Sequence, residues 1–171
     1  MPNGQWQQKP DYHKALELYN RIITEFKKGE TRYYEDAKQR IKSITEATIS
    51  INVANIFLPG SEIEAYLSWR NQKKIDFTIY QIDLARDVSF NKNYGAGNWI
   101  HSVKVSGKKT VKSWSKSIEN LDYMPGSETI RLEEKLPAGA YIIEAKGDKS
   151  SNRDLILVTD ITLVLKTAKK Q

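Results

Sequence analysis

The chain of 171 residues contains no cysteine. Disulfide bonds, thiolate metal ligands, cysteine nucleophiles and internal thioesters are therefore excluded, while the redox compartment stays undetermined. Long hydrophobic runs are also absent, because stretches such as LILV and ITLVL fall far short of the roughly 20 residues that span a bilayer. The N-terminal stretch MPNGQWQQKPDYHK has no apolar segment typical of a secretion signal, although a chain whose signal had been removed would look the same. The 39% of hydrophobic residues suffices for one core of ordinary size.

Groups with catalytic chemistry are scarce. His13 and His101 lie in separate segments, so we interpret them as structural residues rather than as a shared metal site. The GKKT stretch lacks the spacing and the strand-to-helix context of a phosphate-binding loop. Glu133 and Glu134 are adjacent, and adjacent side chains of a strand point to opposite faces, so they cannot act as a catalytic pair. The sequence predicts a non-enzymatic protein with no catalytic residue, no cofactor and no metal site.

Two amphipathic helices are predicted at the start of the chain. Asp11 is a suitable N-cap for the first helix and Gly29 a suitable residue to end it, with Lys27 and Lys28 near the negative end of its dipole. Thr31 precedes the second helix, whose first turn is acidic. The apolar spacing of three and four comes from Tyr12, Ala15, Leu16, Tyr19, Ile23 and Phe26, and then from Tyr34, Ala37, Ile41 and Ile44. A short connection joins the two helices into an antiparallel helical hairpin.

The run ALELYNRIITEFKKGETRYYEDAKQRI resembles a tetratricopeptide repeat, with Ala15 and Tyr19 at that family's small-residue and aromatic positions. The proline that usually closes the second helix of the repeat is absent. Only one repeat is present, whereas a solenoid needs about three to be stable. Two interpretations stay open: the helical hairpin packs on the neighbouring domain, or it caps a longer upstream array.

From Thr48 onward the hydrophobic period changes from helical to two, and no helix is expected between residues 48 and 160. Leu-Pro-Gly and Leu-Pro-Ala-Gly turns each start a new strand. The predicted strands are TISINVAN, EIEAYLSW, IDFTIYQIDL, IHSVKV, TVKSWSKSI, ETIRLEE, GAYIIEAK and RDLILVTD. Short strands separated by turns are typical of a β-sandwich. The predicted fold is therefore mainly β, an antiparallel β-sandwich of the macroglobulin or immunoglobulin-like kind, preceded by a two-helix hairpin.

One predicted strand changes its apolar face along its length. In IDFTIYQIDL the alternating set begins with Ile75, Phe77 and Ile79 and then moves to Tyr80 and Ile82. This switch indicates either a β-bulge or a strand that is covered on both faces.

Three stretches together resemble the first macroglobulin-type domain of bacterial alpha-2-macroglobulin-like proteins. They are VANIFLPGSEIEAYLSWRNQKKIDFTIYQIDL, SWSKSIENLDYMPGSETIRLEEKLPAGAYIIEAKG and RDLILVTDITLVLK. The most specific pieces are SWRN before Y-x-I-D-L, Trp114 before DYMPGS, and LPAGAYIIEA. The departure from the pattern is a long insertion at residues 86–112.

The resemblance implies a non-catalytic structural domain of a protease-trapping protein, located in the periplasm or on the cell surface. Its partners would be sister macroglobulin-type domains and, indirectly, target proteases. The reactive thioester of that family cannot be present, because the chain has no cysteine. The expected division is a helical hairpin at residues 1–47 and a sandwich at residues 48–160. Residues 161–171 would be the first strand of a following domain, or would instead complete this sandwich.

A basic stretch supplies the candidate interaction surface. The chain carries a formal net charge of +6, and residues 88–118 contain lysines without any acidic residue. HSVKVSGKKTVKSWSKS is predicted to form a β-hairpin that turns at residues 106–109. Lysines beside a tryptophan can bind a polyanion, but they can also protect a sheet edge while their stems cover the indole. The candidate residues are Lys108, Lys109, Lys112, Trp114 and Lys116. A stand-alone sandwich that binds a polyanion or another ligand is the alternative function.

Overall fold

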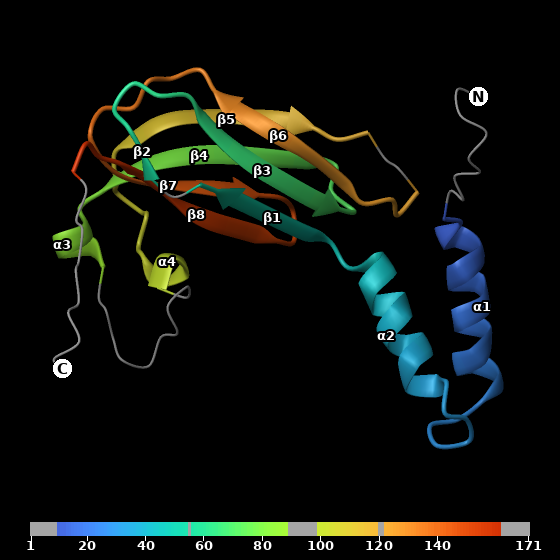
Figure 1. The fold of residues 1–171 in the computed structure, drawn as a ribbon. Helices are drawn as coiled ribbons and strands as arrows, with labels where there is room; N and C mark the ends of the chain where they lie inside the picture. Colours follow the sequence, from blue (N-terminus) through green and yellow to red (C-terminus); the bar gives the residue numbers. More distant parts are fainter. Residues whose placement is uncertain (1–9, 55, 89–98, 120–121, 162–171) are drawn as a thin grey trace, which may run out of the picture.

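The computed structural model describes residues 10–54, 56–88, 99–119 and 122–161. The helical hairpin lies at one end of a two-layered β-sandwich, and two single-turn helices lie near the other end (Figure 1). The protein is mainly β, with a sandwich of largely antiparallel strands behind an N-terminal pair of helices. None of the described helices has the length and hydrophobicity needed to cross a lipid bilayer.

The helical hairpin consists of α1 (Tyr12–Glu25) and α2 (Tyr34–Thr45), which pack against each other. Asp11 is the N-cap of α1, as predicted, and its carboxylate accepts a hydrogen bond of 2.8 Å from the Lys14 N–H. The expected end at Gly29 is wrong. Helix α1 stops at Glu25, and Gly29 turns the connection with a φ of 91°. Lys27 and Lys28 therefore lie outside the helix, beyond the last turn that they were expected to stabilise.

The sandwich has a three-stranded sheet in the order β1-β3-β6 and a five-stranded sheet in the order β2-β8-β7-β4-β5. The small sheet contains β1 (Thr48–Val53), β3 (Ile63–Arg70) and β6 (Gly126–Leu132). The large sheet contains β2 (Ile56–Phe57), β4 (Lys74–Ile82), β5 (Thr110–Ser117), β7 (Gly139–Lys146) and β8 (Ser151–Val158). All strand pairs are antiparallel except β2 with β8, which is parallel. The chain passes from the small sheet to the large sheet between β1 and β2.

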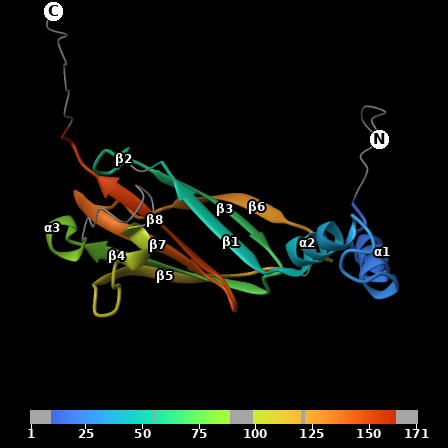
Figure 2. The same ribbon diagram turned by 90° about the horizontal axis from the view of Figure 1, so that it is seen from below.

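Side chains from both sheets form the buried core. Leu67 of β3, Phe77 of β4 and Ile143 of β7 are each at most 1% exposed. Strand β1 runs beside β8 (Figure 2). Side chains of β8 accept hydrogen bonds from the backbone of β1. Asn152 accepts a hydrogen bond of 3.0 Å from the Ile51 N–H, and Asp154 also accepts one from β1. This side of the sandwich is therefore closed by hydrogen bonds between the layers.

The face switch in β4 reflects cover on both faces of the strand, while the bulge lies in its neighbour. A register shift at Ile79 and Tyr80 leaves Val111 as an extra residue in β5, so a bulge is present, on the partner strand. The pairing of β4 with β7 continues without a shift. Ile82 lies on the outer face of the sheet in a second buried cluster with Ile142. The strand is therefore also covered on both faces at this end.

The cover of that outer face corrects two expectations. Residues 100–105 were predicted as a strand, and no helix was expected in the sandwich. Instead the structure has α3 (Leu84–Asp87) and α4 (Trp99–Ser102) there. Ile100 and Val103, three residues apart, point from α4 and the residue after it into the outer cluster. The predicted β-hairpin is also wrong, because β5 pairs with β4 rather than with residues 101–105. Residues 99–105 of the insertion pack on the sheet as a cover instead of extending it.

Candidate functional site

The predicted lysine surface does not form one patch. Lys112, Trp114 and Lys116 share a face of β5, as strand alternation predicted, but this face points into the sandwich. They lie opposite the buried residues of β4, and the Trp114 ring stacks on Phe77 with a centroid distance of 4.9 Å and an interplanar angle of 11°. Lys109 precedes the strand and is exposed. The face of β5 that was predicted as a polyanion-binding surface therefore packs largely against the core.

Both lysines of this face make ion pairs across the edge of the sandwich, between β5 and the β6 side. Lys112 Nζ lies 2.5 Å from the Glu134 carboxylate, and Lys116 Nζ lies 2.6 Å from Glu128 Oε2. Lys112 Nζ also lies 5.4 Å from the centre of the Trp114 ring. We call these two ion pairs the β5–β6 seam. Inward-pointing charges on an edge strand discourage the addition of another strand, so the seam both closes the sandwich and protects its edge.

The Glu134 carboxylate of the seam has a shifted pKa. The hydrogen bond from Lys112 holds its pKa below its ordinary value, because the ammonium favours the ionised form. The expectation that Glu133 and Glu134 lie on a strand is wrong, since β6 ends at Leu132. Sequence patterns gave no signal for this ion pair, because Glu134 is 22 residues from Lys112.

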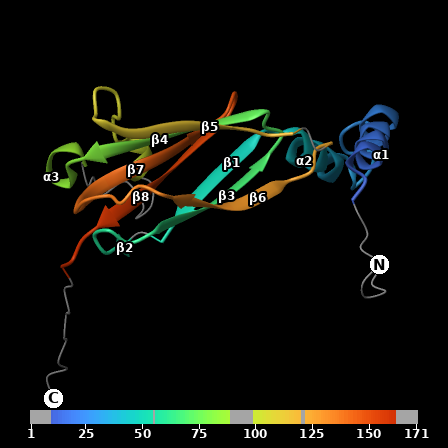
Figure 3. The ribbon, with the colours of Figure 1, turned by 90° about the horizontal axis from the view of Figure 1, so that it is seen from above.

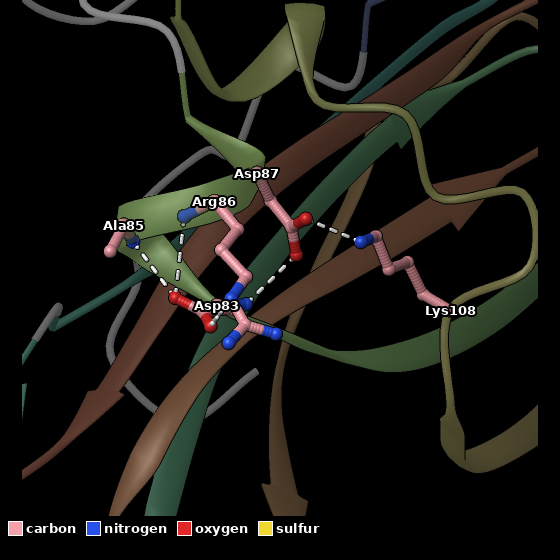
Figure 4. A network of polar contacts seen from close by, with 5 residues as sticks. All are labelled: Asp83, Ala85, Arg86, Asp87 and Lys108. Carbon is pink, nitrogen blue, oxygen red and sulfur yellow. Dashed lines mark hydrogen bonds and ion pairs between the residues drawn. The ribbon is translucent and has the colours of Figure 1, made fainter.

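Lys108 belongs to a different network at the start of the insertion (Figure 4). The Asp83 carboxylate accepts hydrogen bonds from the Ala85 and Arg86 N–H groups, and the Asp83 N–H donates to Asp87. Lys108 then forms an ion pair with Asp87. The hydrogen bond from the Asp83 backbone, and then that from Lys108, lower the pKa of Asp87. Lys108 therefore connects the two ends of the insertion.

The junction between the helical hairpin and the sandwich depends on two residues whose role sequence analysis missed. They are Arg70, the last residue of β3, and Asn71, which follows it in the connection to β4. Arg70 donates a hydrogen bond of 2.8 Å to the Ser43 carbonyl, and Asn71 donates to the carbonyls of Ile44 and Glu46 at 2.7 and 3.1 Å. These carbonyls belong to the end of α2, where the helix itself supplies no partner. The guanidinium of Arg70 also suits the negative end of that helix.

Further contacts complete this junction. The Arg70 guanidinium lies 4.9 Å from the centre of the Tyr12 ring in α1. Gln72, which follows Asn71, is 5% exposed and donates to the Ser150 hydroxyl at 2.9 Å, which fixes this connection to the sandwich itself. Asn71 has a φ of 53°, a left-handed conformation that asparagine tolerates better than most residues. The SWRN piece of the sequence therefore attaches the hairpin to the sandwich.

A cleft of about 730 Å³ lies at the same junction. Its lining includes His13, Trp69, Glu119, Asp122 and Tyr123. His13 lies 3.3 Å from the Asp122 carboxylate, and its ring meets Tyr123 edge-on at 5.3 Å. The His13 and Asp122 side chains are 65% and 78% exposed, so their contact contributes little to stability. In chemical terms the cleft offers an open, mixed-charge surface.

The histidines occupy the separate positions that the sequence predicted. His13 lies in α1, whereas His101 lies in α4 rather than at the start of a strand. In the described ranges, no group of three or more histidine, aspartate or glutamate side chains is arranged to hold a metal ion. The structure therefore brings neither histidine into a candidate metal site.

Comparisons with known proteins give a likeness of shape only. No protein-family model matches the chain, and no curated protein matches it. The CARDB domain of a Pyrococcus furiosus protein, crystallised with di-metal ions, is 12% identical over 67% of this chain and 88% of its own, with a TM-score of 0.37. The bacterial hydrophobin BslA is 15% identical over 67% of this chain and 98% of its own, with a TM-score of 0.36.

A third structure is the sulfur carrier protein SoxY from Chlorobium limicola. It is 11% identical over 74% of this chain and 98% of its own, with a TM-score of 0.31. At these TM-scores and identities, none of the three proteins supports an inference about what this chain binds or does.

Proposed function

We propose that this chain is a non-catalytic structural and interaction domain, and that it acts within an alpha-2-macroglobulin-like protease trap. One observation carries the interaction role. Helix α1 has an apolar stripe but contains no buried residue. Leu18, Phe26 and Tyr33 of the helical hairpin are 47%, 43% and 51% exposed. A contact with another protein would cover these exposed apolar side chains.

The charged residues favour a protein partner over a polyanion. Lys108, Lys112 and Lys116 each have a carboxylate partner within the chain. A polyanion would have to compete with these carboxylates for the lysines. The three lysine side chains are also 37% exposed or less. The helical hairpin is therefore the better candidate for the contact surface.

The protease-trap assignment rests on the sequence resemblance alone. From it follow the proposed partners, which are sister macroglobulin-type domains and, indirectly, target proteases. The proposed location, the periplasm or the cell surface, follows from the same resemblance. The SWRN piece, which is among the most specific of that resemblance, has a structural role here because Arg70 and Asn71 hold the end of α2.

Two measurements test the two parts separately. An antibody against this sequence, applied to an extract of the source cells, is expected to detect a polypeptide many times larger than 19.6 kDa. A band at 19.6 kDa would contradict the protease-trap assignment. For the interaction role, a photo-crosslinking residue replaces Leu18, with replacement of the exposed Thr129 in β6 as the matched control. We expect cross-links from position 18 to other domains of the same polypeptide, and equal yields at both positions would contradict the role of the hairpin.

A further inference from the structure

The connection between the two helices combines exposed aromatic rings with an excess of positive charge. We call residues 26–33, which join α1 to α2, the hairpin tip. Phe26 is 43% exposed and Tyr33 is 51% exposed. Between these two rings the sequence has three cations and one acidic residue: Lys27, Lys28, Arg32 and Glu30.

The cations of the hairpin tip are poorly neutralised. In the described part of the chain, Lys27 and Arg32 have no carboxylate partner. Lys28 lies 3.3 Å from the Glu35 carboxylate, but the two side chains are 79% and 60% exposed, so this ion pair is weak. In α1, by contrast, both cations have a carboxylate partner three or four residues away. The positive charge of the hairpin is therefore available mainly at its tip.

The rings and the cations of the hairpin tip lie next to each other. The Arg32 guanidinium lies 4.7 Å from the centre of the Tyr33 ring. Phe26 directly precedes Lys27 and Lys28. Aromatic rings and lysine stems that end in charged or polar groups suit the boundary between lipid headgroups and acyl chains, because one part is apolar and the other is wet.

The hairpin tip projects away from the sandwich. The contacts that hold the hairpin come from Arg70 and Asn71 to the end of α2, and from Asp122 to His13 near the start of α1. Because the two helices are antiparallel, residues 26–33 lie at the opposite end of the hairpin (Figure 1). The 14 residues of α1 span about 21 Å, so a flat surface can reach the tip without touching the sandwich.

Exposed apolar side chains at the far end of the sandwich lack this basic character. Figure 3 shows β2 and the end of β8 at the end of the sandwich away from the hairpin. The charged residues nearest to this apolar group in the described sequence are acidic, Glu62 and Asp160. The strand predicted to follow, residues 162–171, lies outside the described residues. The apolar group consists of Ile56, Leu58 and Ile161.

We propose that the hairpin tip docks on a membrane surface that contains anionic lipids. The rings of Phe26 and Tyr33 enter the headgroup region, and the three cations contact lipid phosphates. Each lysine or arginine near an anionic membrane strengthens binding by about fivefold, and the two rings add apolar burial. A soluble polyanion offers no apolar layer to the rings, so the tip favours a lipid surface.

This inference goes beyond the proposed function and does not rest on it. Leu18 lies about 12 Å from Phe26 along α1, so the contact with another protein and the contact with lipid are separable by substitution. Vesicles that contain no protein test the lipid contact alone.

Vesicle flotation of the full chain provides the test. We expect the protein to float with vesicles of phosphatidylcholine and phosphatidylglycerol in equal parts at about 50 mM salt, where screening is weak. Binding to pure phosphatidylcholine vesicles should be at least about tenfold weaker, because the lysines and Arg32 then lack a partner. Failure to float with the anionic vesicles would overturn the proposal, and so would equal binding to both kinds of vesicle.

Two pairs of variants test whether the tip is the site. Lys27→Ser/Lys28→Ser and Phe26→Ala/Tyr33→Ala should each weaken binding to the anionic vesicles by about tenfold or more. Lys104→Ser/Lys109→Ser, which removes two exposed lysines from the sandwich, and Leu18→Ala should leave it unchanged. Equal losses in the two lysine variants would mean that only the net charge of the protein attracts it to the vesicles, and the proposal would be wrong.

A polarity-sensitive dye reports the orientation. The chain has no cysteine, so Glu30→Cys and Thr129→Cys each carry a single label, on the tip and on the sandwich. We expect the emission of the dye at position 30 to increase at least about twofold on anionic vesicles, and that at position 129 to stay unchanged, because only the tip enters the headgroup region. Equal increases at both positions would contradict docking through the tip.

Discussion

The helical hairpin and the sandwich are held together by different means. In the sandwich, residues such as Leu67 and Ile143 are entirely buried between two sheets. In the hairpin, α1 has no buried residue, and α2 buries only Ala37 and Ile44. The prominent contacts between the two parts are polar, from Arg70 and Asn71 to the end of α2. The sandwich is therefore stabilised mainly by apolar burial, whereas the position of the hairpin depends on a few hydrogen bonds.

This difference indicates which part is free to adapt. A segment with few buried apolar contacts opens at a lower free energy than a core, so the hairpin should exchange its amides faster than the sandwich. A hairpin that is anchored at one end can keep its apolar surface available without loss of the sandwich fold. The following predictions sharpen or break this comparison.

The largest effect is expected in the core of the sandwich. Phe77→Ala should lower the free energy of unfolding by about 3–5 kcal/mol, since the ring is 1% exposed and stacks on Trp114. The control Leu18→Ala, at a side chain that is 47% exposed in the hairpin, should cost less than about 1 kcal/mol. Denaturant unfolding followed by tryptophan fluorescence measures both. Similar costs for the two variants would break the comparison.

A smaller, local effect is expected at the junction. Asn71→Ala removes the donor to two carbonyls of α2 and should cost about 1–2 kcal/mol, with faster amide exchange in the hairpin and little change in the sandwich. Asn71→Gly is the control for backbone strain, because glycine adopts the φ of 53° without cost but also lacks the amide. If Asn71→Gly leaves hairpin exchange unchanged, the role that we assign to the Asn71 amide is wrong.

The β5–β6 seam should contribute modestly and in a pH-dependent way. Glu134→Gln is expected to cost about 0.5 kcal/mol at neutral pH, because the pair with Lys112 is partly exposed. The pKa of Glu134 is lowered in the folded protein, so the ionised carboxylate stabilises the fold at neutral pH. That contribution is lost as the pH falls below the ordinary glutamate value of about 4.3 and through the lowered folded value.

The check is the free energy of unfolding of wild type and Glu134→Gln, measured at pH 7 and in acid. The Glu133→Gln variant is the control. Glu133 has no ion pair within the described part of the chain. A difference between wild type and Glu134→Gln that grows toward acid would contradict the assigned sign of the pKa shift.

The smallest effect is expected for polyanion binding. Heparin or a labelled oligonucleotide at about 50 mM salt, where counterion release favours binding most, should bind weakly or not at all. Changing Lys108, Lys109, Lys112 and Lys116 to Ser should then make no difference to binding, and Lys27→Ser/Lys28→Ser, which removes two exposed lysines elsewhere, is the control for loss of charge. Salt-dependent binding that only the fourfold variant abolishes would restore the polyanion interpretation.

The sequence alone determined the local features of this protein. The change of period at Thr48 separated helices from strands, because side-chain direction repeats every 3.6 residues in one and every two in the other. Asp11 identified the start of α1 by its capping chemistry. Alternation also placed Lys112, Trp114 and Lys116 on one face of a strand.

Only the tertiary structure decided what those faces meet. The partner of Lys112 is Glu134, and the helix end held by Arg70 and Asn71 lies about 27 residues earlier in the chain. Ile100 and Val103 formed a cover for the large sheet instead of a strand because an apolar outer face was available to them. Alternation specifies that a side chain has a direction, but burial and ion pairing depend on which distant segment the fold brings to that side, and local sequence does not contain that contact.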